Sequence, residues 1–161
     1  MKHNPDIAAL AWEPLFVLDL AVDYGRALHA GEMGVAGRSL FPVTHGTFEG
    51  PRLRGSVEPG GMDWVQWRED GVMLIDVRLM LRTDDDGLIA MAYTGMTHAE
   101  PEVLERFRRR ESYEFGEAYS RVTARFETRD ERYNWLNRIV SVANGMRTTG
   151  DGPIYHVFEI R

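Results

Sequence analysis

Residues 64–97 read WVQWREDGVMLIDVRLMLRTDDDGLIAMAYTGMT, and this stretch decides the fold class. Its apolar and polar residues alternate in short runs separated by turn signals, which predicts strands over 64–67, 72–82 and 88–97. Asp70-Gly71 is a typical hairpin turn, and Asp85-Asp86-Gly87 turns the chain a second time. The stretch therefore predicts three consecutive antiparallel strands.

The rest of the chain shows the same pattern of short apolar runs between Gly-containing turns. Further strands are predicted over 15–22, 119–126, 135–144 and 154–160. One short helix is predicted near 101–110, because Pro101 suits the first turn of a helix. We expect residues 1–13 to form an N-terminal extension and residues 23–41 a long loop or lid.

This arrangement favours an all-β fold, a single antiparallel β-barrel domain over residues 1–161 with one short helix. A barrel is preferred to an open sandwich because closure removes the exposed strand edges that so many strands would otherwise carry.

Composition excludes several classes of protein. Lys and Arg number 19 and Asp and Glu number 25, so the formal net charge is −6 and no nucleic acid partner is expected. The absence of cysteine excludes disulfides, thiolate metal sites and cysteine nucleophiles. The chain has neither a long apolar run nor a basic-then-apolar leader, so we expect no membrane association and a soluble, cytoplasmic protein.

Motif searches are also mostly negative. The chain has no phosphate-binding Gly-x-x-x-x-Gly-Lys loop, no dinucleotide-binding Gly-x-Gly-x-x-Gly and no Gly-x-Ser-x-Gly nucleophile elbow. No two of the five histidines are two or four residues apart, so neither a metal site nor a cofactor is expected, although distant strands could still assemble a metal site.

Asp76 and Arg78 are polar residues two apart in an otherwise apolar strand, so they lie on the same face. If that face lines a barrel interior, the pair could provide an acid or base, or an anchor for a polar substrate group. If the face is solvated, the pair is ordinary surface decoration of little energetic importance. Asp63 and His45 lie in Gly-rich segments and are further titratable candidates, with turn chemistry and simple solvation as the alternatives.

Several segments together resemble the bacterial and fungal family called domain of unknown function 3237. The segments are 46–55 (GTFEGPRLRG), 59–64 (PGGMDW), 76–78 (DVR), 81–87 (LRTDDDG), 125–128 (RFET) and 133–138 (YNWLNR). The chain differs from the family pattern at His45, where a Gly is usual, and at Leu79, where a Tyr is usual. The resemblance implies a single-domain β-barrel with an internal cavity that assembles as a homodimer. It also points to shared positions that alternation could direct inward: Asp63, Trp64, Asp76, Arg78, Arg121, Trp135 and Asn137.

We therefore expect a cofactor-independent enzyme that acts by acid/base chemistry on a small aromatic or polyketide-like molecule in the barrel cavity. Lyase, isomerase, cyclase and hydrolase reactions all stay open. Asp76 is the first candidate for the acid or base, with Asp63 and His45 as alternatives, and Arg78 would hold a carbonyl or carboxylate. The expected substrate-binding residues are Trp64, Tyr93, Tyr119, Arg121, Trp135 and Asn137. A non-catalytic binding or carrier barrel and a protein-interaction module are the alternatives.

Overall fold

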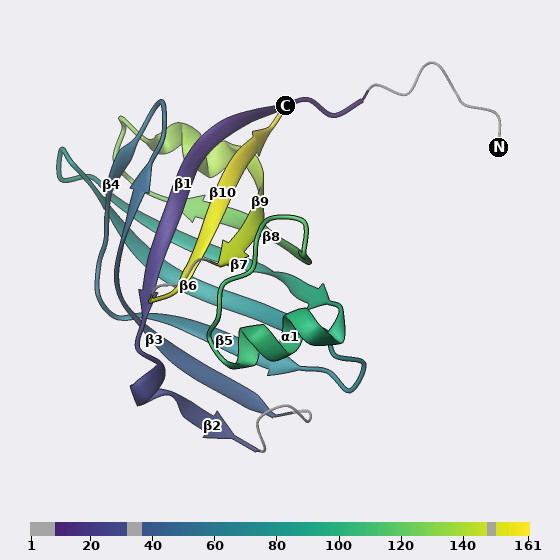
Figure 1. Ribbon diagram of the computed structural model, residues 1–161. Helices are drawn as coiled ribbons and strands as arrows, with labels where there is room; N and C mark the ends of the chain where they lie inside the picture. The colour runs from purple at the N-terminus through teal and green to yellow at the C-terminus, as the bar shows by residue number, and fades with distance from the viewer. Residues whose placement is uncertain (1–8, 32–36, 148–150) are drawn as a thin grey trace.

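The computed structural model describes residues 9–31, 37–147 and 151–161 (Figure 1). The elements in chain order are β1 (Trp12–Val22), η1 (Tyr24–Arg26), β2 (Leu28–Ala30), β3 (Arg38–Glu49), β4 (Arg54–Val57), β5 (Gly61–Trp67), β6 (Met73–Thr83), β7 (Leu88–Ala99), α1 (Pro101–Arg108), β8 (Ala118–Glu127), η2 (Asn134–Arg138), β9 (Val140–Arg147) and β10 (Pro153–Ile160).

The strands close into an antiparallel barrel. Neighbouring strands follow the order β1-β10-β9-β8-β7-β6, and β1 also pairs with β3, which completes the circle. Both β4 and β5 pair with β3 and β6, so they share one of the eight positions around the barrel. The predicted fold, a single antiparallel barrel with one short helix, is confirmed.

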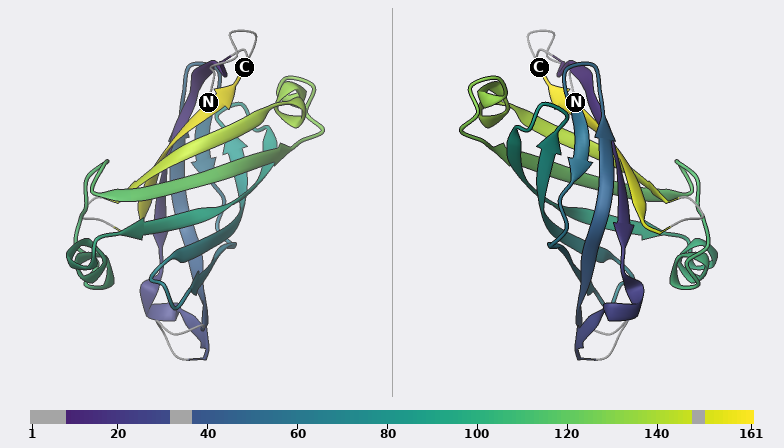
Figure 2. Two further views of the ribbon diagram at one scale, coloured as in Figure 1. Left: turned by 90° about the vertical axis from the view of Figure 1, so that its right-hand side faces the viewer. Right: turned by 90° about the vertical axis from the view of Figure 1, so that its left-hand side faces the viewer.

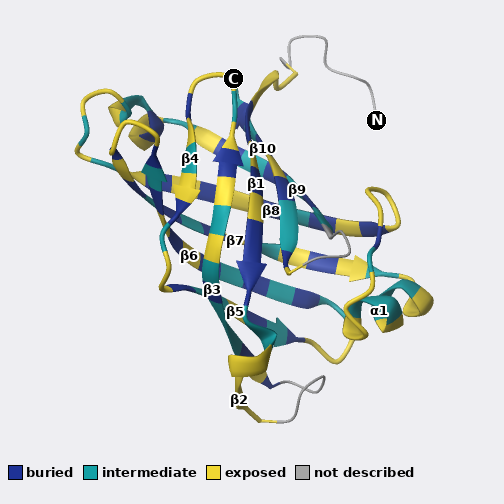
Figure 3. Cartoon of the chain, turned by 60° about the vertical axis from the view of Figure 1, so that its left-hand side comes forward, coloured by how far each residue is buried: buried dark blue, intermediate teal, exposed yellow. Residues whose placement is uncertain are grey.

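Alternation along each strand sets which residues face inward (Figure 3). On β6 the inward set is Met73, Ile75, Val77, Leu79 and Leu81, all nearly or completely buried. The residues between them point away from the barrel. Because the inward face of β6 is uniformly apolar, its register against β5 and β7 is strongly specified.

The two ends of the barrel differ in how they are filled. At one end Phe16 packs against Phe48 and Phe126, with ring centroids 5.6 and 5.9 Å apart, and Leu136 of η2 is buried beside the core. Figure 2 shows α1 at the other end, together with η1, the short helix after β1. The end that contains Phe16, Phe48 and Phe126 is thus solidly packed, and we call it the packed end. The end near α1 is covered by short helices (Figure 2).

Two secondary-structure predictions need correction. Residues 23–41 were expected to be a loop or lid, but β2 occupies 28–30 and pairs with the start of β3 at 38–40. The sequence analysis also predicts no strand over the remainder of β3, up to Glu49. Pro42 and Gly46 interrupt the alternation of apolar and polar residues there. Residues 32–36 lie outside the described residues.

The predicted strand over 135–144 begins only at Val140, because residues 134–138 form η2. Of those residues only Leu136 is buried, so the segment lacks the alternation that a strand requires. In the expected N-terminal extension, residues 1–8 lie outside the described residues, and β1 already begins at Trp12.

No helix in the described ranges is long and apolar enough to cross a membrane.

Candidate functional site

A cavity of about 80 Å³ lies inside the barrel at the end near α1 and η1. Its walls carry six aromatic side chains, several aliphatic ones and very few polar groups. The lining residues are Tyr24, Phe41, Asp63, Val65, Trp67, Met73, Ile75, Thr97, Phe107, Tyr113, Ser120, Pro153 and Tyr155. An apolar, aromatic hollow with a few convergent polar groups is the usual form of a small-molecule site.

Asp63 enters this cavity because of its position on β5. Gly61, Asp63, Val65 and Trp67 share the inward face of the strand, whereas Trp64 lies on the outward face. Asp63 pairs with Phe41 of β3 on one side and with Val77 of β6 on the other, so it sits in the middle of the sheet. Strand alternation thus places a carboxyl group among apolar side chains.

The environment of Asp63 makes it unusual. Its Oδ1 atom is completely buried and has no hydrogen-bond partner among the described residues. An unpartnered buried polar group destabilises a fold by about 1–3 kcal/mol, so such groups need an explanation. Burial raises the pKa of the Asp63 carboxyl from 3.8 to about 7, and the negative charge of Asp76 adds to the rise. Near neutral pH this carboxyl is therefore present in both its acid and its base form.

Two buried tyrosines lie beside the carboxyl. The rings of Tyr93 and Tyr155 are 5.2 Å apart, and a hydrogen bond joins their hydroxyls. Burial raises the pKa of Tyr93 well above 10.0, and Tyr155 and Asp63 add to the rise. Burial also raises the pKa of Tyr155, with Asp63 as the next cause. Both phenols therefore stay neutral, and Asp63 is close enough to influence each electrostatically.

A second polar group lies on the wall formed by β7 and β8. The hydroxyls of Thr97 and Ser120 are 2.8 Å apart and both side chains are buried. Gly145 of β9 leaves room for them, because a Cβ atom at that position would lie 2.3 Å from the Ser120 Oγ. The cavity thus carries a carboxyl group and a separate pair of hydroxyls.

Three of the aromatic residues at the outer end of the cavity, Tyr24, Phe107 and Tyr113, come from η1, from α1 and from the loop after α1. The Asp23 side chain accepts hydrogen bonds from the backbone N–H groups of Gly25 and Arg26, which starts η1 and presents Tyr24. Tyr24 packs edge-on against Phe41, with ring centroids 5.6 Å apart. On α1, Phe107 packs against Trp67 and against Tyr113 at 6.1 and 6.0 Å. Rings from outside the barrel wall thus pack against Phe41 of β3 and Trp67 of β5 at this end of the cavity.

Of the predicted site residues, Asp63 lines this cavity, and Tyr93 is buried close enough to Asp63 to interact with it electrostatically. Asp76 and Arg78 lie on the outward face of β6 and form no ion pair with each other or with any described residue. The prediction that Asp76 and Arg78 line the barrel interior is therefore wrong. They lie on the face of β6 that is turned toward solvent. The physical reason is that their neighbours Ile75, Val77 and Leu79 occupy the interior, and alternation leaves Asp76 and Arg78 outside.

The other predicted residues also lie outside the cavity. His45 is exposed on β3, with its Nδ1 3.1 Å from the Thr44 hydroxyl. Trp64 lies on the outer face of β5, and Tyr119 stacks on the outside of β8 against His98 at 4.8 Å. The guanidinium of Arg121 lies 4.9 Å from the centre of the Tyr119 ring. These positions belong to the outer surface.

Trp135 and Asn137 lie on η2 at the packed end of the barrel. The guanidinium of Arg52 is 3.9 Å from the centre of the Trp135 ring. The Asn137 side chain accepts a hydrogen bond from the Thr128 backbone N–H and donates one to the Thr128 carbonyl. Both residues therefore make contacts at the packed end of the barrel and do not line the interior cavity.

Sequence reasoning missed Tyr155, Thr97 and Ser120 as site residues. The signal for Tyr155 was present, because it shares a strand face with Val157 in the run 154–160. The same signal was present for Thr97, which shares a strand face with Met91 and Tyr93, and for Ser120, which shares one with Val122 and Ala124.

Among the described residues, no group of three or more His, Asp or Glu side chains is arranged to hold a metal ion. Asp63 is the one acidic side chain among the cavity-lining residues.

Comparisons with known proteins agree with this architecture. A UPF0311 protein of Rhodopseudomonas palustris is 27% identical over 135 residues, which are 84% of this chain and 88% of that protein. The crystal structure of a beta-barrel like protein from Acinetobacter baumannii AYE has a TM-score of 0.81 and 30% identity, and covers 98% of this chain and 100% of that one. The crystal structure of an enzyme from Penicillium herquei has a TM-score of 0.72 and 20% identity, with 100% of both chains covered. The model of the family described as "Protein of unknown function (DUF3237)" matches residues 10–160, and the chain therefore belongs to this family.

Proposed function

We propose that this protein is an enzyme that moves a proton within a small aromatic molecule bound in the barrel cavity, with Asp63 as the acid/base group. The observation that carries the proposal is the buried, unpartnered Oδ1 of Asp63, in an aromatic cavity and with a pKa near 7. A general acid/base works best when its pKa lies near the working pH. Strongly perturbed carboxyl groups in such cavities are frequent at functional sites.

The cavity chemistry favours a substrate with a ring and few polar atoms. Six aromatic side chains offer stacking and edge contacts to a ring, while the hydroxyls of Thr97 and Ser120 can orient an oxygen atom of the ligand. The volume of about 80 Å³ is well below that of a drug-sized site. It suits one small ring, or the reacting end of a larger molecule whose remainder extends past Tyr24 and Phe107.

The proton transfer needs no other reactant. The Asp63 carboxylate takes a proton from a carbon or oxygen atom of the substrate and becomes a carboxylic acid. That acid then returns the proton to a different atom of the same molecule, so that the product is an isomer, with or without a new ring. The low polarity of the cavity strengthens each of these electrostatic interactions.

The comparison with the Penicillium herquei protein supports catalysis in a general way. That protein has the same fold and is described as an enzyme. At 20% identity the likeness concerns the fold, so the reaction of that protein is not transferred to this one. The assignment of Asp63 depends on the cavity of this chain alone.

Deuterium exchange tests the proposal directly. The protein is incubated in D2O with acetophenone and 4-hydroxyacetophenone as small aromatic probes, and with any small molecule that copurifies. Mass spectrometry then follows deuterium incorporation. We expect incorporation that the wild-type protein accelerates and that Asp63→Asn slows by about 10²-fold or more, while Asp19→Asn, on the outer face of β1, has no effect.

The alternative, a carrier barrel, makes a different prediction. A carrier would bind the probe with a saturable affinity and release it without deuterium. Equal incorporation in the wild-type and Asp63→Asn proteins would remove Asp63 from the mechanism.

A further inference from the structure

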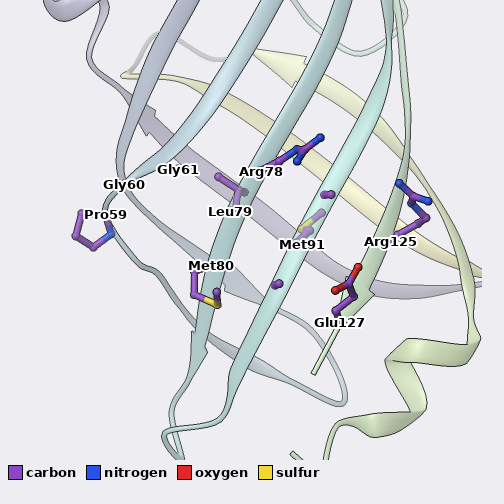
Figure 4. Close-up of a pocket in the computed structure, with 11 residues that line it drawn as sticks. Pro59, Gly60, Gly61, Arg78, Leu79, Met80, Met91, Arg125 and Glu127 are labelled. Atoms are coloured by element: carbon purple, nitrogen blue, oxygen red, sulfur yellow. The ribbon is translucent and has the colours of Figure 1, made fainter. Parts of the chain in front are cut away.

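A groove of about 500 Å³ crosses the outer face of β6, β7 and β8, on the opposite side of the barrel wall from the cavity (Figure 4). Its lining residues are Pro59, Gly60, Gly61, Arg78, Leu79, Met80, Ala90, Met91, Ala92, Arg125 and Glu127. The proposed proton transfer uses none of them. The groove therefore needs an account of its own.

Strand register explains the shape of the groove. Arg78 of β6 and Arg125 of β8 both pair with Ala92 of β7, so the three residues form one row across the sheet. The two arginine Cα atoms are then about two strand spacings apart, or about 10 Å. Because Ala92 has only a methyl group, it forms a floor with a long cationic side chain on each side. Figure 4 shows Arg78 and Arg125 on either side of the strand that carries Met91.

The next row along the strands has the same form with different chemistry. Met80 and Glu127 both pair with Ala90, which again forms a low floor. Residues two apart on one strand are separated by about 6.8 Å. The groove thus presents a cationic row and, about 6.8 Å further along, a row with one apolar side chain and one carboxylate.

Among the residues that the structure describes, the two guanidinium groups have no partner. Neither Arg78 nor Arg125 forms a hydrogen bond or ion pair with any described residue, although Asp76 and Glu127 are each two positions away. The contrast with Arg82, the next outward arginine of β6, is clear, because Arg82 pairs with both Glu58 and Asp86. Two unpartnered guanidinium groups over a low floor form a forked donor set that matches the two oxygens of a carboxylate.

We propose that this outer groove is a second binding site, for a small aromatic carboxylate that carries a hydrogen-bond donor at the far end of its ring. The carboxylate lies over Ala92 between Arg78 and Arg125. The ring lies over Ala90 against Met80, and the donor reaches the Glu127 carboxylate. Glu127 disfavours a doubly charged group such as a phosphate, because the added negative charge would repel it.

Titrations with 4-hydroxybenzoate, followed by amide chemical shifts of the ¹⁵N-labelled protein, test this site. We expect saturable shifts at Gly60, Ala90 and Ala92, and a Kd that Arg78→Gln or Arg125→Gln raises about tenfold or more. Arg138→Gln is the matched control, because Arg138 is exposed on η2 and outside the groove, and it should leave the Kd unchanged. Asp63→Asn should also leave it unchanged, which separates this site from the interior cavity.

Three further ligands check the assigned chemistry. 4-Methylbenzoate lacks the donor and should bind more weakly, and 4-hydroxybenzamide lacks the charge and should not bind in the groove. Tighter binding of phenyl phosphate than of 4-hydroxybenzoate would overturn the carboxylate assignment.

Other outcomes would overturn the site itself. These are shifts confined to residues of the interior cavity, the absence of saturable shifts up to about 10 mM ligand, or an unchanged Kd in both arginine variants. A dimer in sedimentation experiments that Arg78→Gln and Arg125→Gln dissociate would instead identify this face as an interface between two copies of the chain.

Discussion

The Asp63→Asn variant tests the electrostatics of the cavity without any knowledge of the substrate. Asparagine has nearly the same shape as aspartic acid but cannot ionise. In the folded wild-type protein, burial raises the pKa of Asp63 from 3.8 to about 7, so folding disfavours the charged form. The folded state then binds the proton more tightly than the unfolded state over this pH range. The contribution of Asp63 to stability should therefore fall as the pH rises from about 4 to about 7, and level off above that.

The magnitude follows from the size of the shift. A change of one pKa unit corresponds to about 1.4 kcal/mol, and the pKa of Asp63 rises from 3.8 to about 7. The carboxylate therefore destabilises the folded protein by on the order of 4 kcal/mol above pH 7. Asparagine removes this contribution. The variant should equal the wild type near pH 4 and exceed it by about 4 kcal/mol near pH 8.5.

Urea unfolding at several pH values measures this difference, with tryptophan fluorescence as the signal. Other titrating groups are the same in both proteins, so subtracting the two free energies of unfolding isolates position 63. Asp19→Asn, which changes an exposed carboxyl on the outer face of β1, is the control for the Asp-to-Asn substitution itself. A pH-independent difference for Asp63→Asn would refute the raised pKa, and with it the assignment of Asp63 as an acid/base near neutral pH.

Three further substitutions test other parts of the structure. Asp76→Asn removes a negative charge that helps to raise the pKa of Asp63, so a carboxyl ¹³C titration should show the Asp63 midpoint at lower pH, and an unmoved midpoint would contradict this coupling. Phe48→Ala should lower the free energy of unfolding by about 3–5 kcal/mol, measured in urea, because the side chain is fully buried in the packed end. Gly95→Ala would place a Cβ atom 2.0 Å from the Arg121 backbone oxygen, so we expect a loss of about 1–3 kcal/mol and a lower Tm; a wild-type Tm would show that β7 and β8 separate easily.

The strands with clear alternation were predicted well from sequence. β6 and β7 follow the apolar pattern and turn residues of 64–97, which depend on neighbours along the chain. β3 was missed because Pro42 and Gly46 break its pattern, yet pairing with β1 and β5 holds both residues in the sheet. Tertiary pairing outweighs local propensity at such positions.

The candidate site shows the same difference between what the local sequence pattern predicts and what the tertiary structure decides. Asp76 lies in a predicted strand and Asp63 in a Gly-rich segment just before one, and the sequence offered either as the acid or base. Asp76 has the clearer local pattern, but that pattern is what places it on the outer face, between the inward Ile75 and Val77. Asp63 shares its face with Val65 and Trp67, a weaker signal in a short strand that follows two glycines. The two carboxyl groups differ in which face of the strand they occupy, and this is set by their position in the alternation rather than by the type of residue.

The amino-acid sequence alone determined the barrel class, the family and the positions of most strands, because these depend on alternation and turn chemistry within short segments. Only the tertiary structure decided which polar groups meet, since Asp63, Tyr93, Tyr155 and the hydroxyl pair of Thr97 and Ser120 come from four different strands, β5, β7, β8 and β10. The physical reason is that burial and pairing are properties of the closed barrel. A carboxyl group acquires its raised pKa only when distant strands exclude water from around it.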